Sequence, residues 1–252
     1  MNNTIKTTAI LLLSILAIPS LRADAPRVVA TTEWTAAFCR AAGIEDVSVL
    51  APASLAHPPD YDLKPSDIPR IVEADFLIFA GYEGMMERIR SHVAGSDVRL
   101  VQIQTVYEPA VLDESIRRLG RAFGTQDRAD EAIERLEELW SEARSDVDRA
   151  GLHGAPAAVH VFQAPFARQV GLNVVMEFGP APAGPQLIAE AARSGAVLVV
   201  DNRHNPISRP LREVLPEARG MELINFPGTG GTRTLEDVIL HNVRELIDAA
   251  GS

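Results

Sequence analysis

The sequence predicts an α/β protein of two lobes, each with a parallel sheet flanked by helices, bridged by one long helix. Short β-branched runs alternate with short helical patterns, which is typical of a parallel sheet covered by helices. A central stretch has a long amphipathic helical pattern with no Gly or Pro, and the segments after it echo those before it. We therefore expect two similar lobes that face each other across a cleft.

The N-terminal 25 residues have the pattern of a secretory signal peptide. Lys6 precedes an apolar run over Ala9–Ile18, and Ala23 and Ala25 have the spacing of a cleavage site. The run is shorter than the roughly 20 residues that span a bilayer. We predict cleavage after Ala25 and a soluble periplasmic protein, with an uncleaved interfacial anchor as the alternative. Cys39, the single cysteine, lies well after this point, so neither a lipoprotein nor an intrachain disulfide is expected.

The N-terminal α/β lobe is predicted over residues 26–124. The run VVAT, the helical segment WTAAFCRAAG and the run VSVLAP form a strand, a helix and a strand. The pattern is repeated by a helix over Ile68–Ala74 and the strand FLIFAG, and RLVQIQT adds a further strand. Alternating units of this kind predict parallel strands.

Residues 125–150 are predicted to form the long connecting helix. Their apolar residues follow gaps of four and three, which define one helical stripe. These residues are Ala129, Ile133, Leu136, Trp140, Ala143 and Val147. At about 1.5 Å per residue the helix is roughly 35–40 Å long, more than one small lobe needs. An ordinary long helix within a single domain is the alternative.

The C-terminal lobe is predicted over residues 151–252. GAPAAVHVFQAPFARQVGLNVVMEFGP follows the same order of strand, helix, glycine stop and strand as the start of the N-terminal lobe. In this register Glu83 and His204 fall at equivalent positions after equivalent strands. Loops at the carboxyl ends of parallel strands bind ligands in such folds, so both side chains are candidates for the cleft.

Composition and motifs favour binding over catalysis. The chain has 252 residues, 46% hydrophobic and 23% charged, which is an ordinary globular balance. Its formal net charge of −10 leaves no basic surface for nucleic acid or an anionic membrane. The sequence contains no nucleophile elbow, phosphate loop, dinucleotide fingerprint, His-Glu-x-x-His or Cys-x-x-Cys. We therefore predict that the protein is not an enzyme.

Three of the six histidines are candidate metal ligands, because a neutral imidazole binds borderline metals. His57 lies in a loop whose prolines restrict the backbone, although it could merely pack against Tyr61. His160 lies within the apolar run AAVHVFQ, where a satisfied core histidine is the alternative. His204 follows an apolar run, where it could instead cap the next helix. The other three, His92, His153 and His241, are expected to be solvated.

The segment HPPDYDLKPSDIPRIVEADFLIFAGYEGMMERI resembles the hallmark segment of the zinc- and manganese-binding solute-binding proteins of ABC importers. The Phe-Ala-Arg-x-x-Gly-Leu helix and the ending LINFPGTGGTRTLEDVILHN extend the resemblance over most of the mature chain. The resemblance implies two α/β lobes bridged by a long helix, a metal ion between them, little domain closure and an ABC permease as partner. We expect a monomer.

When the ligand positions of this family are carried over to the present sequence, the resemblance implies His57 as the first ligand. The second ligand, usually histidine, falls near Gln104, and the fourth, usually a carboxylate, falls on Asn225. The third falls on His160 or on Gln163, depending on where the strand ends. His204 could restore a missing ligand, and Glu83 and Gln163 could bind directly or orient the ligands. With imidazoles and no carboxylate, softer or weaker binding is expected.

The predicted function is therefore capture of a divalent transition metal, Zn²⁺ first and Mn²⁺ second, for delivery to a permease. One alternative is that the same fold holds a metal chelate or a small organic ligand, hydrogen-bonded by Gln104, Gln163 and Asn225. A second is a periplasmic metal-dependent hydrolase, for which Glu83 is the candidate base.

Overall fold

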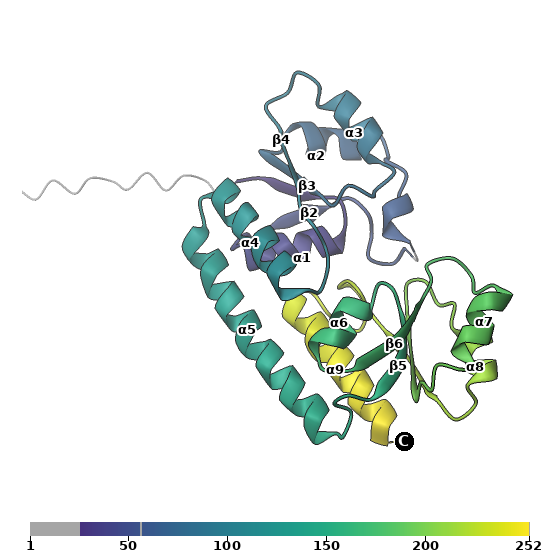
Figure 1. The fold of residues 1–252 in the computed structure, drawn as a ribbon. Coiled ribbons are helices and arrows are strands. Elements are labelled where there is room, and N and C mark those ends of the chain that lie inside the picture. Colours follow the sequence, from purple (N-terminus) through teal and green to yellow (C-terminus); the bar gives the residue numbers. More distant parts are fainter. Residues whose placement is uncertain (1–25, 56, 252) are drawn as a thin grey trace, which may run out of the picture.

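The computed structural model describes residues 26–55 and 57–251. The predicted signal peptide lies outside these residues. The chain forms two lobes, one above the other in Figure 1, and the C-terminus lies at the far end of the lower lobe. No helix in the described part has the length and apolar character needed to cross a membrane.

The N-terminal lobe holds a parallel sheet with the strand order β2-β1-β3-β4. Its strands are β1 (Val28–Ala30), β2 (Val47–Val49), β3 (Phe76–Phe79) and β4 (Arg99–Gln102). Its helices are α1 (Glu33–Ala41), the 3₁₀ turn η1 (Pro58–Asp60), α2 (Asp67–Val72), α3 (Met86–His92) and α4 (Pro109–Phe123). The β-branched and aromatic runs form strands, as predicted, because β1 and β3 are buried on both faces.

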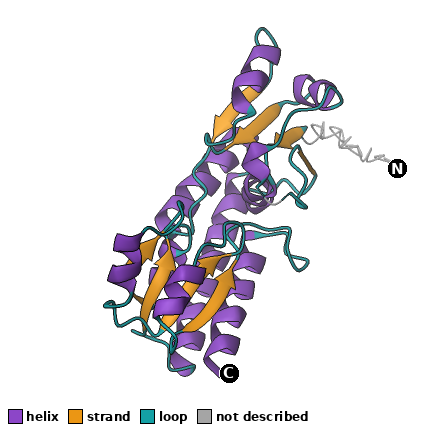
Figure 2. Ribbon diagram, turned by 90° about the vertical axis from the view of Figure 1, so that its right-hand side faces the viewer, coloured by secondary structure: helices purple, strands orange, loops and turns teal. Residues whose placement is uncertain are grey.

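The C-terminal lobe repeats this topology with the strand order β6-β5-β7-β8. Its strands are β5 (Pro156–His160), β6 (Asn173–Phe178), β7 (Leu198–Asn202) and β8 (Arg219–Leu223). Its helices are α6 (Ala164–Gln169), α7 (Pro185–Ala191), α8 (Arg209–Val214) and α9 (Leu235–Gly251). Helices surround this sheet in the turned view of Figure 2. The shared strand order supports the internal repeat, and the predicted fold class is confirmed.

Helix α5 (Gln126–Arg149) is the predicted long helix. It begins two residues after Gly124, which ends α4 with a φ of 74°, a left-handed conformation that favours glycine. The predicted apolar stripe of α5 is buried against α4 and α9. Figure 1 shows α5 running from the upper lobe along the side of the lower one.

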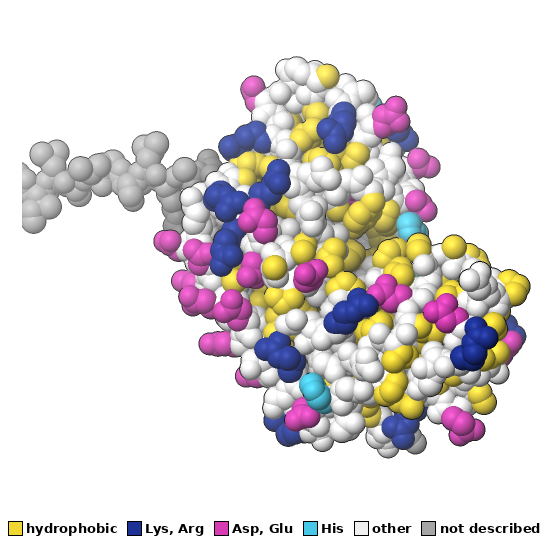
Figure 3. Space-filling model, viewed as in Figure 1, with side chains coloured by type: hydrophobic (Ala, Val, Ile, Leu, Met, Phe, Trp, Pro, Cys, Tyr) yellow, Lys and Arg dark blue, Asp and Glu magenta, His cyan; other side chains and the backbone are white. Residues whose placement is uncertain are grey.

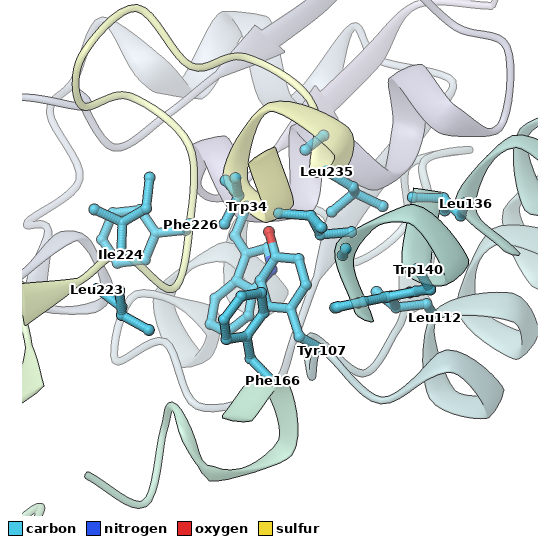
Figure 4. Packing of buried hydrophobic residues seen from close by; sticks show 14 of the residues in the cluster. Trp34, Tyr107, Leu112, Leu136, Trp140, Phe166, Leu223, Ile224, Phe226 and Leu235 are labelled. Carbon is cyan, nitrogen blue, oxygen red and sulfur yellow. The ribbon is translucent and has the colours of Figure 1, made fainter. Parts of the chain in front are cut away.

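One hydrophobic core is continuous through both lobes. Trp34 of α1 stacks on Tyr107 with ring centroids 5.9 Å apart, and it packs at 6.1 Å against Phe226 of the C-terminal lobe. Trp140 of α5 contacts Phe166 of α6 at 5.8 Å. Figure 4 shows these rings gathered between helices of both lobes. Because opening the lobes would expose this apolar surface to water, we expect only small movements between them.

Candidate functional site

The main candidate site is a cleft of about 550 Å³ between the two lobes. The carboxyl ends of both sheets face it, and most of its lining residues lie one to three positions after a strand. Examples are Thr32 after β1, Tyr82 after β3, Gln104 after β4, Phe162 after β5, His204 after β7 and Asn225 after β8. This is the position at which open parallel sheets bind their ligands. Figure 3 shows hydrophobic side chains gathered where the lobes meet.

His57 lines the cleft from the N-terminal lobe. It directly precedes η1, and Pro58 and Pro59 restrict the backbone on which it sits. Its Nδ1 lies 3.0 Å from Oδ2 of Asp60. Because a carboxylate accepts hydrogen bonds, Nδ1 donates to Asp60, which leaves Nε2 as the ring nitrogen available to a metal. The His57 side chain is 56% exposed, so a solute can reach it.

His204 lines the cleft from the C-terminal lobe. Its Nδ1 donates to Oδ1 of Asn225 at 2.7 Å, and its ring stacks on Phe226 with centroids 3.7 Å apart. The pKa of His204 is lowered to about 4, mainly by burial; the hydrogen bond to Asn225 acts to raise it, and nearby Arg203 and His57 act to lower it. His204 is therefore neutral at pH 7.

The two histidines have the arrangement of oriented metal ligands. In each ring Nδ1 bonds a side-chain oxygen, which leaves Nε2 as the nitrogen available to a metal. Oxygen partners of this kind fix the tautomer and orientation of metal-binding imidazoles. Both rings line the same cleft, one from each lobe. Two of the three predicted histidines thus come together.

The structure does not bring His160 to the cleft. His160 is the last residue of β5 and is completely buried, with its ring packed between Phe162 and Phe178. Its Nδ1 accepts from the Phe162 N–H at 3.1 Å, while Nε2 is buried without a hydrogen-bond partner among the described residues. Gly179 lies so close that a Cβ there would be 2.6 Å from Nε2. His160 is therefore a core residue in this conformation.

Glu83 and Gln163 also lie behind the cleft wall rather than in it. Glu83 is 4% exposed, and its carboxylate accepts from the Thr31 hydroxyl at 2.5 Å and from the Ala80 and Gly81 N–H groups at 2.9 and 2.7 Å. It fixes the loop after β3, and its oxygens are already engaged.

Gln163 occupies the position before α6 and is 1% exposed. Its Nε2 donates to Oδ1 of Asn202 and to the carbonyl of Leu223, both at 3.2 Å. Asn202 itself lines the cleft. Gln163 thus orients a cleft residue from behind. Neither His160 nor Gln163, the two alternatives for the third ligand, lines the cleft in this structure.

Sequence reasoning missed the aromatic part of the site. Trp34, Phe162 and Phe226 line the cleft together with Tyr82. Each lies a few residues after a strand, and this position could have indicated a residue of the cleft. An aromatic residue at such a position is equally compatible with the hydrophobic core, so the sequence alone does not decide. Gln104 and Asn225, carried over as altered ligand positions, both line the cleft. Within residues 26–55 and 57–251, no three His, Cys, Asp or Glu side chains lie close enough together to hold a metal ion.

Solved structures of periplasmic metal-binding and solute-binding proteins share this fold. No protein-family model matches the chain, and no curated protein matches its sequence significantly.

Three similar solved structures show the likeness. The Mn²⁺ complex of the solute-binding protein FpvC from Pseudomonas aeruginosa is 17% identical, with a TM-score of 0.68 over 90% of this chain and 99% of that one. The Mn-bound periplasmic metal-binding protein of Candidatus Liberibacter asiaticus is 12% identical, with a TM-score of 0.67 over 89% and 99%. A mutant of the laminin-binding adhesin Lmb of Streptococcus agalactiae is 13% identical, with a TM-score of 0.69 over 89% and 99%. At such identities the likeness is one of fold.

Proposed function

We propose that the chain is an exported solute-binding protein, a divergent member of the zinc- and manganese-binding family, that captures a divalent transition metal for an ABC permease. The observation that carries this proposal is the pair His57 and His204. They reach one cleft from different lobes, and each has Nε2 as its remaining donor. A metal ion bound to both would link the lobes. Similar folds in complexes with Mn²⁺, Ni²⁺ and Cd²⁺ support the choice of ligand.

The donor set favours zinc over manganese. Imidazole nitrogen suits Zn²⁺, whereas Mn²⁺ prefers carboxylate, carbonyl and water oxygens. Asp60 is the one acidic side chain that lines the cleft in the described part of the chain, and it already accepts from His57. Two imidazoles leave further coordination positions for water or another small ligand.

A carrier role fits the site better than hydrolysis. A metal-dependent hydrolase needs a general base within reach of a metal-bound water. Glu83, the candidate base, lies outside the cleft lining and accepts three hydrogen bonds. Export is supported by the signal-peptide pattern of the first 25 residues and by the periplasmic proteins that share the fold.

The proposal is tested by titrating Zn²⁺ into untagged, metal-free protein in a calorimeter at neutral pH. His57→Ala and His204→Ala should each remove one coordination bond and weaken binding at least about tenfold, which corresponds to about 1.4 kcal/mol. His160→Ala should leave the affinity unchanged, because His160 does not reach the cleft.

His92→Ala is the control, since His92 is exposed on α3 and bonds the Arg88 carbonyl of its own helix. Wild-type affinity in both His57→Ala and His204→Ala would contradict the proposed site. A loss of affinity equal to theirs in His92→Ala would show that binding is nonspecific.

A further inference from the structure

The cleft is far larger than a bare metal ion requires. Its volume of about 550 Å³ lies within the range of roughly 300–1,000 Å³ that is typical of small-molecule sites. A water molecule takes about 30 Å³ of liquid volume, so an ion with a few waters would fill only part of this space. The remaining volume is large enough for a small organic ligand.

The cleft is also short of charged ligands. Structural and catalytic zinc sites usually take three or four protein ligands, whereas His57 and His204 supply two imidazole nitrogens. Asp60 is the one acidic group lining the described cleft, and its side chain is 80% exposed. The protein would therefore leave the two positive charges of a bound divalent metal ion largely unneutralised. A cargo whose charge is already balanced avoids this cost.

The walls are those of a site for an organic molecule. Phe162 and Tyr82 line the cleft while keeping 45% and 52% of their surface exposed, although aromatic side chains usually bury much of theirs. The amides of Gln104 and Asn205 and the hydroxyl of Thr105 add neutral hydrogen-bonding groups around them. A few polar groups set among apolar surfaces are typical of sites that orient a small ligand.

We propose that the natural cargo is a divalent metal already held by a small anionic chelator with a flat, apolar face. This inference rests on the proposed function, because His57 and His204 complete the coordination of the metal. The aromatic walls contact the chelator, and the neutral amides bond its polar edge. The chelator, rather than the protein, balances the charge of the metal.

The test compares four probes by calorimetry on untagged wild-type protein: Ni²⁺ alone, the 1:1 complex of Ni²⁺ with pyridine-2,6-dicarboxylate, the 1:1 complex with iminodiacetate, and metal-free pyridine-2,6-dicarboxylate. The two chelators carry the same donor atoms and charge, but only the first has an aromatic ring. We expect the aromatic complex to bind at least tenfold more tightly than each of the other three probes.

Variants separate the walls from the metal ligands. Phe162→Ala and, independently, Tyr82→Ala should weaken the aromatic complex about three- to tenfold and leave Ni²⁺ alone unchanged. His57→Ala and His204→Ala should weaken both. Leu240→Ala on α9 is the matched control, because Leu240 is a 39% exposed apolar residue outside the cleft lining.

The outcomes distinguish the two proposals. If Ni²⁺ alone binds as tightly as its aromatic complex and still depends on both histidines, the chelate inference is overturned and the proposed function stands. If the metal-free chelator binds as tightly as its complex, the inference that the metal joins the chelator to His57 and His204 is overturned. If no probe binding depends on either histidine, both proposals fail.

Discussion

The surroundings of the His204 ring determine its pKa. Stacking on Phe226 removes one face of the ring from water, and Oδ1 of Asn225 accepts a hydrogen bond from Nδ1. An amide oxygen accepts this bond without supplying negative charge, so burial outweighs it and the ring stays neutral at pH 7. A neutral ring with a fixed tautomer can bind a metal without first losing a proton.

The pKa of His204 predicts how the stability of metal-free protein depends on pH. In the unfolded chain the imidazole protonates near its ordinary pKa of 6.5, whereas in the folded protein it protonates near 4. As the pH falls from about 6.5 to about 4, the unfolded state binds the extra proton and is favoured, so the folded state loses roughly 2–3 kcal/mol. Urea unfolding measured at a series of pH values with EDTA present should show this loss.

His204→Gln is the comparison variant, because Gln does not titrate. Its unfolding free energy should fall less steeply than that of the wild type over the same pH interval. Parallel pH profiles for the two proteins would show that His204 is not held neutral by the fold.

For single residues, the sequence predicted that His57 and His204 lie at the cleft, as they do. It did not predict which way the His160 side chain points. The pleat of a strand sends successive side chains to opposite faces, so a shift of one residue decides between cleft and core. His160 is still part of β5, and the cleft wall begins two residues later at Phe162.

The loop that carries His57 is anchored by one carboxylate at the start of α2. Asp67 is buried and accepts from the Lys64 N–H at 2.8 Å, from the Tyr61 hydroxyl at 2.9 Å and from Arg70 at 2.5 Å. Burial acts to raise the pKa of Asp67, but these hydrogen bonds and the charge of Arg70 outweigh it and lower the pKa. The contribution of Asp67 to stability is present above its unfolded pKa and is lost as the pH falls through the lowered folded value.

Asp67→Asn should destabilise the protein by roughly 1–3 kcal/mol, because a buried acceptor becomes partly a donor and loses its charge-assisted bonds. It should also weaken Zn²⁺ binding, since the His57 loop loses its anchor. Urea unfolding at pH 7 and zinc titration measure the two effects. Asp62→Asn is the matched control, as Asp62 is almost fully exposed and its pairing with Arg88 is a surface one. Equal unfolding midpoints for the two variants would show that Asp67 does not anchor the His57 loop.

At the element scale, the sequence predicted most helices and strands because their apolar patterns are long or strongly β-branched. The stripe from Ala129 to Val147 is buried as expected, since seven-residue spacing of large apolar side chains leaves little choice of face. Loops follow no such period. Glu83 was placed correctly after β3, but its direction depends on hydrogen bonds to Thr31 and to the loop itself, which the pattern does not encode.

Taken as a whole, the molecule consists of two sheets of the same strand order joined by a shared core. Trp34 and Phe226 come from different lobes and contact both the core and the cleft. The site is therefore built on surfaces that already hold the lobes together. A cargo bound there adds a further link without requiring a large closure.

Cargo binding should raise the stability of the whole chain. A ligand that binds only the folded state adds RT ln(1 + [L]/Kd), which is about 2.7 kcal/mol at a free concentration of 100 times Kd. The melting temperature of wild-type protein should rise with Zn²⁺, and excess EDTA should reverse the rise. The double variant His57→Ala/His204→Ala should show no rise. An equal rise in the double variant would place the stabilising ion elsewhere.

The central claim is that His57 and His204 together hold the metal across the cleft. X-ray absorption spectroscopy at the zinc edge of protein loaded with one Zn²⁺ counts imidazole ligands directly. We expect two imidazole nitrogens, with oxygen ligands in the remaining positions. A spectrum without imidazole scattering, or one that requires three or more imidazoles, would contradict it.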